Sequence, residues 1–241
     1  MQVRALPSSR IPLVLKLEGV TKSYGGLRSR VVLREVALEL GRGEFIAIMG
    51  ESGVGKSTLL NLIAGLDIPD AGRIVLDGTD LTQLDDTART LIRRARMGFI
   101  FQAIHLLPHL TLARNVRLPL DLAGVARADA DRRTQAMLEA AGIASLARDY
   151  PRTLSGGEAQ RAGIARGLVH EPALVLADEP TGNLDAESAA QVLALLRDEV
   201  KRRAAAGVLV THSVTAARFA DRVYELTGAG LVPRSLPASG A

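Results

Sequence analysis

The sequence has no cysteine and no tryptophan, and aromatic residues make up 3% of its 241 positions. Without cysteine the chain has no disulfide framework, no thiolate zinc site and no cysteine nucleophile. So few aromatic rings leave little material for a platform on which nucleic-acid bases could stack. The longest stretch without a charged residue, residues 97–113, contains two histidines, a glycine, a glutamine and a proline. Since a spanning helix needs about 20 mostly apolar residues, we expect no membrane span. The N-terminal apolar run, residues 11–15, is too short for a secretory signal, so we also expect a cytosolic chain.

Lysine is scarce as well. Among the 30 basic residues the lysines are Lys16, Lys22, Lys56 and Lys201, and the arginines are scattered among 26 acidic residues. The net charge of +4 therefore forms no basic block, and we expect no nucleic-acid partner. Apolar residues make up 47% of the chain and charged residues 23%, a balance typical of a folded globular protein.

No repeat or linker divides the sequence. We therefore predict a single domain over residues 13–232, with flexible tails at residues 1–12 and 233–241. Residues 103–161 are helical or loop-like in pattern, which predicts a helical subdomain inserted into the main domain.

The apolar pattern changes along the chain. Val36, Leu38 and Leu40 alternate with other residues, which predicts a half-buried strand, and residues 13–17 offer an antiparallel partner. Short continuous apolar runs, typical of parallel strands covered on both faces, occur at residues 45–49, 174–177 and 208–210. Helical stretches separate these runs, and the clearest, residues 186–204, repeats its apolar residues on one helix face. Strands that alternate with helices predict an α/β fold with a mainly parallel sheet.

The apolar run at residues 45–49 leads into a segment that fits the pattern GxxxxGK[ST]. The segment comprises Gly50, Glu51, Ser52, Gly53, Val54, Gly55, Lys56, Ser57 and Thr58. Glycines let the backbone curl into a nest of N–H groups, Lys56 adds a positive charge, and a following helix presents its positive end. We predict a nucleoside triphosphate site in which Ser57 binds Mg²⁺ through its hydroxyl; the alternative is a plain glycine-rich turn.

Two carboxylates close the apolar run at residues 174–177. Ligands in an open α/β sheet bind at such strand ends. We expect Asp178 to bind Mg²⁺ through water, and Glu179 to face the γ-phosphate and accept a proton from the attacking water. The alternative is a pair of solvated acids before the turn at Pro180.

A second anion site is suggested by the segment LSGGEAQR, residues 154–161, at a predicted helix start. Ser155 is a natural helix cap, and Gly156 and Gly157 leave backbone N–H groups accessible. One chain does not need two γ-phosphate cradles, so we infer that this one serves the nucleotide of another copy. As local structure alone it would be a capped helix.

These motifs together resemble the ATP-binding subunits of ABC transporters. The resemblance covers about residues 15–227 and rests on GESGVGKST, a glutamine after a strand, LSGGEAQR, LVLADE, the following Asn183-Leu184-Asp185 and a histidine after residues 208–211. LSGGEAQR is the most specific of them. GLDIPDAG, MGFIFQAIHLLPHLT and LADEPTGNLD resemble the branch of lipoprotein-releasing and macrolide- or peptide-export systems and their cell-division relative.

The resemblance implies that two copies close head to tail around two ATP molecules, each held between the phosphate loop of one chain and residues 155–157 of the other. Tyr24 is implied to stack on adenine, and Gln102 to meet Mg²⁺ and the attacking water. His212 is implied to contact the γ-phosphate and orient the water of Glu179, and Asp185 to belong to the nucleotide site. Read without the resemblance, these would be a half-buried tyrosine, a surface glutamine and a structural histidine.

The resemblance also implies a separate integral membrane permease, and a place at the cytoplasmic face of a bacterial cell membrane. Power supply to an export or lipoprotein-extraction transporter is the leading hypothesis. One alternative is a membrane-tethered regulator of cell-division or cell-wall enzymes; another, a soluble ATPase acting on DNA or ribosomes, is disfavoured by the short insertion before Ser155. Three positions depart from the usual branch pattern: Arg114 where Glu is common, Ala159 for Gln, and Ser213 for Asp.

Overall fold

The computed structural model describes residues 12–25 and 30–237. Most of the two tails expected at residues 1–12 and 233–241 thus lies outside the described residues. Pro12 directly precedes the first strand, and Pro233 is the last residue of the final strand, β10 (Gly230–Pro233). In the part of the chain that the structure describes, no helix has both the length and the apolar character needed to span a membrane.

An antiparallel sheet of four strands forms the N-terminal part of the fold, with strand order β2-β1-β4-β5. The strands are β1 (Leu13–Tyr24), β2 (Arg30–Gly41), β4 (Ala71–Leu76) and β5 (Thr79–Asp80). The expected antiparallel pairing is confirmed, since Leu17 of β1 lies opposite Leu38 of β2. The alternation predicted for β2 is also present: Val36, Leu38 and Leu40 are buried, and Ala37 and Glu39 between them are exposed.

A second sheet carries six strands in the order β10-β9-β3-β8-β7-β6. Besides β10, its strands are β3 (Phe45–Met49), β6 (Met97–Phe101), β7 (Leu174–Asp178), β8 (Ala206–Val210) and β9 (Arg222–Thr227). All neighbours pair in parallel except the edge strand β10, which is antiparallel to β9. Every residue of β3 and β8 is buried, as the continuous apolar runs predicted. The α/β class with a mainly parallel sheet is therefore confirmed.

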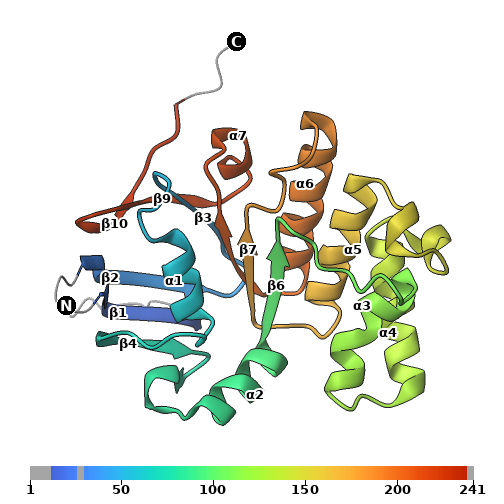
Figure 1. Cartoon of the computed structure of the whole chain (residues 1–241), viewed down its shortest axis with the longest axis horizontal. Helices are drawn as coiled ribbons and strands as arrows, with labels where there is room; N and C mark the ends of the chain where they lie inside the picture. The colour runs from blue at the N-terminus through green and yellow to red at the C-terminus, as the bar shows by residue number, and fades with distance from the viewer. Residues whose placement is uncertain (1–11, 26–29, 238–241) are drawn as a thin grey trace, which may run out of the picture.

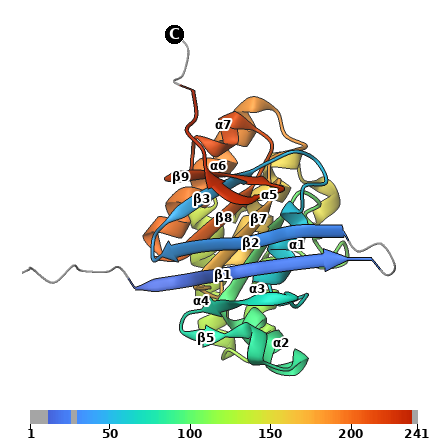
Figure 2. The ribbon, with the colours of Figure 1, turned by 90° about the vertical axis from the view of Figure 1, so that its left-hand side faces the viewer.

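Helices cover both faces of the six-stranded sheet (Figure 1). The helices outside the helical insertion are α1 (Lys56–Ile63), α2 (Asp86–Arg96), α6 (Ala186–Arg202) and α7 (Val214–Ala217). Helix α1 buries Leu59, Leu62 and Ile63 in a core shared by the two sheets, and Figure 2 shows β1 and β2 crossing in front of it. On the other face, the predicted stripe of α6 packs Val192, Leu193, Leu196 and Val200 into a second core.

The chain between β6 and β7 is helical, as expected for the insertion. It contains α3 (Leu112–Leu122), α4 (Arg127–Ala140) and α5 (Gly156–Leu168), with short 3-10 turns at Ala144–Leu146 and Pro151–Thr153. The boundary expected near residue 161 falls inside α5, which runs on to the sheet. There Gly98 of β6 faces the carbonyl of Gly167 so closely that a Cβ on Gly98 would collide with it. Helix α5 therefore belongs to both the insertion and the sheet core.

Candidate nucleotide site

The phosphate loop joins β3 to α1 and depends on its glycines. Gly50, Gly53 and Gly55 have φ angles of 152°, 76° and 115°, a region that favours glycine because it has no Cβ. A Cβ on Gly50 would lie 2.7 Å from the carbonyl oxygen of Leu226, and one on Gly55 would lie 2.8 Å from Val32 Cγ1. No side chain caps the N-terminus of α1 at Gly55. The first N–H groups of this helix are thus left for an anion.

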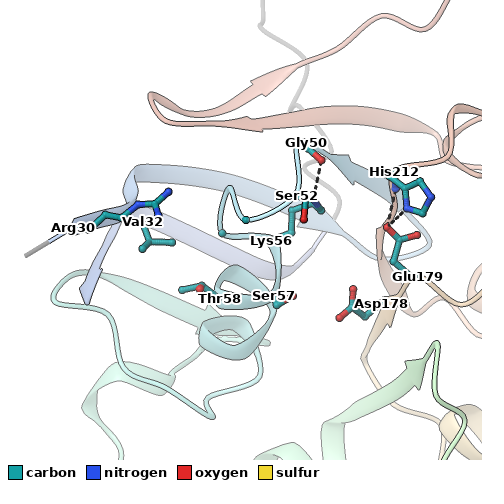
Figure 3. A pocket seen from close by; sticks show the side chains of 12 residues that line it. Arg30, Val32, Gly50, Ser52, Lys56, Ser57, Thr58, Asp178, Glu179 and His212 are labelled. Atoms are coloured by element: carbon teal, nitrogen blue, oxygen red, sulfur yellow. Dashed lines mark hydrogen bonds and ion pairs between the residues drawn. The ribbon is translucent and has the colours of Figure 1, made fainter. Parts of the chain in front are cut away.

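Lys56 crosses the mouth of the loop. Its Nζ donates to the carbonyl oxygens of Gly50 and Glu51, both at 2.7 Å, and Figure 3 shows the bond to Gly50. The side chain is therefore folded over the place where the loop N–H groups and the helix end converge. A triphosphate that binds there meets the positive ammonium group of Lys56, which is already at the site.

A cavity of about 490 Å³ opens between this loop and the carboxyl ends of β7 and β8 (Figure 3). Its lining comprises Arg30, Val32, Gly50, Ser52, Gly53, Gly55, Lys56, Ser57, Thr58, Asp178, Glu179 and His212. The loop and the two carboxylates, more than 100 residues apart in sequence, thus share one cavity. Arg30 and Val32 were not singled out from the sequence, because only the packing of β2 against the loop brings them here.

Glu179 is held in an unusual backbone conformation, with φ at +46°. Its N–H donates to the carbonyl oxygen of Val210 at 2.9 Å, which ties it to the end of β8. One carboxylate oxygen accepts the His212 N–H at 2.9 Å and lies 2.7 Å from His212 Nδ1. The other accepts the Thr211 hydroxyl at 3.1 Å. A non-glycine residue at positive φ costs free energy, and such residues are common at functional sites. The backbone conformation and the bonds to Thr211 and His212 together fix the direction of the carboxylate.

Thr211 is a site residue that sequence reasoning missed. It is 1% exposed, and its hydroxyl also accepts the N–H of Ser213 at 3.1 Å. A threonine between an apolar strand and a histidine carries no signal of its own. The structure gives it the task of orienting one oxygen of Glu179.

The residues expected to bind Mg²⁺ are only partly brought together. Ser57 and Asp178 line the cavity, whereas Gln102 does not and donates through Nε2 to Asn183 Oδ1 at 3.2 Å. The pKa of Asp178 is raised, first by burial and then by the neighbouring Glu179. A cation beside this carboxylate would offset both effects. Among the described residues no group of three or more His, Asp or Glu could hold a metal ion.

The loop that carries Gln102, residues 102–111, has no helix or strand. Several of its backbone groups bond instead to side chains of the helical insertion, namely the buried Asn115 and Gln160 and the partly buried Arg166. Asn115 of α3 accepts the N–H of Leu107 and donates to the carbonyls of Leu107, Leu110 and Thr111 at 2.7–3.1 Å. From α5, Gln160 donates to Phe101 O at 3.3 Å, and Arg166 donates to Ile104 O and His105 O at 2.5 and 2.7 Å. The loop is therefore fastened to the helical insertion rather than to the phosphate loop.

The segment expected to form a second anion site lies at the start of α5, where the structure has a capped helix N-terminus. The Ser155 hydroxyl accepts the N–H of Glu158 at 3.4 Å, and the Glu158 carboxylate accepts the Ser155 N–H at 2.8 Å, a capping box. Asp185 caps α6 close by, accepting the N–H of Ser188 at 2.9 Å. Gly157 faces this Ser188, since its Cβ would lie 3.5 Å from the Ser188 hydroxyl.

None of these residues lines the cavity at the phosphate loop. Ser155, Gly156 and Asp185 are exposed, whereas Gly157, which was also expected to be accessible, is buried. The structure gathers residues 155–157 and Asp185 into one cluster, but it does not bring that cluster to the cavity of the same chain. The two halves of the expected site are therefore separate within one copy.

Tyr24 ends β1 beside the cavity but is not among its lining residues. Tyr24 is 45% exposed, and its hydroxyl donates to Asp67 Oδ2 at 2.6 Å. Thr58, which does line the cavity, is close enough to act on the pKa of the Tyr24 phenol. Tyr24 thus lies next to a residue that lines the cavity without lining it itself.

Two of the three departures from the branch pattern have a local account. Ser213 caps α7 by accepting the N–H of Ala216 at 3.2 Å, a task that serine and aspartate share. Arg114 is exposed in the first turn of α3, away from the cavity. Nothing in the structure explains Ala159.

A separate groove of about 310 Å³ runs between α2, β6, α3 and α5. Its apolar floor includes the stacked rings of Phe99 and Phe101, whose centroids are 5.9 Å apart, and Leu122 stands 58% exposed at its edge. Arginines line it as well, namely Arg93, Arg94 and Arg166. Burial lowers the pKa of His170 in this groove, which favours the neutral imidazole.

Comparisons with known proteins agree with this geometry. The sequence pattern of the family described as ABC transporter matches residues 33–182. The chain is 43% identical to the lipoprotein-releasing system ATP-binding protein LolD of Saccharophagus degradans over 88% of this chain and 94% of that protein. It is 44% identical to an uncharacterized ABC transporter ATP-binding protein of Mycobacterium tuberculosis over 86% of this chain and 84% of that protein.

A solved structure is similar over nearly the whole fold. It is the dimeric ATP-binding cassette MJ0796 in a post-hydrolysis state bound to ADP and Pi, with 37% identity and a TM-score of 0.82. The match covers 93% of this chain and 100% of that one. With the phosphate loop, the paired carboxylates and the capped LSGGEAQR helix all in place, this chain belongs to the ABC transporter family as an ATP-binding, ATP-hydrolysing cassette.

Proposed function

We propose that this cassette powers an export or lipoprotein-extraction transporter by closing head to tail with a second copy around two ATP molecules. The observation that carries the proposal is the division of the site: the phosphate-loop cavity lacks residues 155–157, which form a capped helix start elsewhere on the chain, with Ser155 and Gly156 exposed. A second copy that presents this helix start to the cavity would complete the site. The dimeric state of the similar ADP- and Pi-bound cassette supports such a pairing.

Each half of the proposed site contributes differently to ATP. Lys56 and the uncapped N–H groups of α1 meet the β- and γ-phosphates, and Tyr24 stacks on the adenine. From the other copy, Ser155 and the N–H groups of α5 approach the γ-phosphate from the opposite side. Both halves place positive dipoles on the phosphates, but each half belongs to a different copy. One copy alone therefore does not surround the nucleotide.

Hydrolysis then needs a positioned water and charge neutralisation. Glu179 accepts the proton of the attacking water, and His212, which contacts the same carboxylate at 2.7 Å, orients that carboxylate and meets the γ-phosphate. Ser57, Asp178 and Gln102 would hold Mg²⁺, which supplies positive charge to the phosphate oxygens when bound. The loop that carries Gln102 is bonded to α5 of the helical insertion. Gln102 would therefore approach the site together with the insertion.

Intersubunit complementation tests the head-to-tail pairing. Lys56→Ala disables the loop half and Ser155→Arg the helix half, so each variant alone should be nearly inactive. In a mixed dimer, the loop of the Ser155→Arg chain faces the intact helix start of the Lys56→Ala chain. An equal mixture should therefore regain up to about a quarter of the wild-type turnover per chain, since half of the dimers are mixed and each has one intact site of two.

The measurement is phosphate release by each variant, by their mixture and by wild type at equal total concentration. As a control, a mixture of Lys56→Ala with the double variant Lys56→Ala/Ser155→Arg has no intact site in any pairing and should stay inactive. Restoration that appears in this control too, or a mixture no more active than its parts, would refute the pairing.

The membrane partner is proposed to dock in the groove of Phe99, Phe101 and Leu122. Its apolar floor suits an amphipathic helical segment, and Arg93 and Arg94 suit acidic groups on that segment. The naming of the LolD relative as the ATP-binding protein of a lipoprotein-releasing system supports a partner of this kind. Such docking would place this chain at the cytoplasmic face of the cell membrane.

Affinity capture tests the partner. The Glu179→Gln form, tagged and incubated with ATP, should retain an integral membrane protein from solubilised membranes. A groove variant, Phe101→Asp, should lose that protein while it still binds ATP, because the groove is separate from the cavity. Capture of cell-wall enzymes with no transport activity would favour the regulatory alternative, and capture of no membrane protein would contradict both.

A further inference from the structure

Tyr24 stands in a cluster of charges that the nucleotide chemistry does not use. Its hydroxyl donates to Asp67 Oδ2 at 2.6 Å, and Asp67 Oδ1 accepts from Lys22 Nζ at 2.8 Å and from the N–H of Ile68 at 2.7 Å. Lys22 Nζ also donates to the carbonyl oxygen of Ile68 at 2.7 Å and lies 5.2 Å from the centre of the Tyr24 ring. Every polar atom of the Asp67 carboxylate is thus engaged, and one of its bonds holds the phenol.

The cluster joins the end of β1 to the chain that follows α1. Lys22 is buried although charged, with 11% of its side chain exposed, and it belongs to β1 two residues before Tyr24. Asp67 follows α1, and its N–H donates to the carbonyl oxygen of Asn61 at 3.3 Å in that helix. The phosphate-loop helix is therefore linked through Asp67 to the ring at the end of β1.

A buried lysine needs a compensating carboxylate, and Asp67 is the nearest one. Burial acts to raise the pKa of Asp67, but the bonds from Lys22 and Tyr24 outweigh it and lower the pKa. Because Asp67 stays ionised, its bond to the Tyr24 hydroxyl is charge-assisted and stronger than a neutral one. Without this bond the exposed Tyr24 side chain could change rotamer, and it would lose that freedom on binding a base, which lowers the affinity.

From this geometry we infer that Asp67, held by Lys22, is a positioning residue that fixes the Tyr24 ring in place for a purine base before ATP arrives. The inference rests on the proposed stacking of Tyr24 on adenine. It assigns to Asp67 a contribution to base binding alone. The triphosphate is held by Lys56 and the loop, which Asp67 does not contact.

The test separates base binding from phosphate binding. Affinity is measured by calorimetry for Mg–ATP and for Mg–tripolyphosphate, which has the phosphates but no base, and the ratio of the two affinities reports the contribution of the base. Asp67→Ala and Tyr24→Phe should each lower this ratio about three- to tenfold, the cost of ordering one side chain on binding. Both should leave tripolyphosphate affinity unchanged, whereas a damaged fold would weaken both ligands.

Three further variants sharpen the result. The double variant Asp67→Ala/Tyr24→Phe should match the singles, because both remove the same bond. Asp70→Ala removes a matched carboxylate that accepts the Ser23 N–H at 2.6 Å but does not bond to Tyr24, and it should keep the wild-type ratio. Asp67→Asn, which keeps an acceptor oxygen, should fall between wild type and Asp67→Ala.

Tyr24→Ala separates a failure of the proposed stacking of Tyr24 from a failure of the proposed role of Asp67. If it leaves the ratio unchanged, the stacking role of Tyr24 is wrong and the role of Asp67 is wrong with it. If Tyr24→Ala collapses the ratio while Asp67→Ala and Tyr24→Phe keep it, stacking stands and the positioning role of Asp67 is refuted. Equal losses in Asp70→Ala and Asp67→Ala would also refute it, since they would show a general effect of charge.

Discussion

Replacing Glu179 by Gln should lower ATP turnover by a factor of about 10² to 10⁴, the usual contribution of a positioned general base. The amide cannot accept the proton of the attacking water, but it is nearly the same size as the carboxylate. Its oxygen can still accept the N–H of His212, which lies 2.9 Å away in the native site. The variant should therefore fold normally and bind ATP, with the chemical step alone disabled.

Two measurements check this expectation together. Phosphate release per chain should fall, and size-exclusion chromatography with saturating Mg–ATP should show a stable dimer that wild type does not accumulate. The dimer accumulates because ATP remains intact between the two copies. A variant that hydrolyses ATP at more than a tenth of the wild-type rate would contradict the base role, and one that stays monomeric with bound ATP would contradict the pairing.

A matched control is available in Glu171. This glutamate also has a positive φ, 57°, and is exposed, with its carboxylate 3.7 Å from Arg203 rather than at the cavity. Glu171→Gln makes the same chemical change in a similar backbone setting. Because an exposed ion pair contributes little, turnover should stay within about twofold of wild type.

Replacing Lys56 by Ala should abolish useful ATP binding. Its ammonium group already lies at the loop, bonded to the carbonyls of Gly50 and Glu51 at 2.7 Å, and a bound triphosphate would take over those bonds. Truncating one partner of a desolvated charge pair costs about 2 to 5 kcal/mol, which weakens binding at least about 30-fold. Calorimetry with Mg–ATP measures the loss directly.

The loss should be confined to binding. Without nucleotide, the thermal midpoint of Lys56→Ala should lie close to that of wild type, because the core residues of α1 are untouched. Lys16→Ala serves as the control: it removes a lysine that pairs with Glu18 at 2.7 Å on the surface of β1, and it should bind ATP normally. Unchanged affinity in Lys56→Ala would overturn the assigned role of this residue.

Local sequence determined the strands and the phosphate loop. The continuous apolar runs of β3, β7 and β8 and the alternation in β2 reflect how many faces of each strand are covered, a property that each segment carries by itself. Gly50 and Gly55 were identifiable because their positive φ angles exclude other residues. The two carboxylates after β7 could be placed at the cavity because parallel strands end at one edge of a sheet.

Only the tertiary structure decided which of these groups meet. Thr211 and Asn115 carry no motif, and Asp67 lies in GLDIPDAG, whose pattern alone does not indicate its partners. Each of the three matters through a hydrogen bond to a residue that is distant in sequence or to an irregular loop. The end of the helical insertion could not be read from pattern, since α5 is one unbroken helix that packs on both the insertion and β6. Sequence thus determined the local conformations, which depend on side-chain size and backbone sterics; packing between distant segments determined the partners, including the separation of residues 155–157 from the cavity of their own chain.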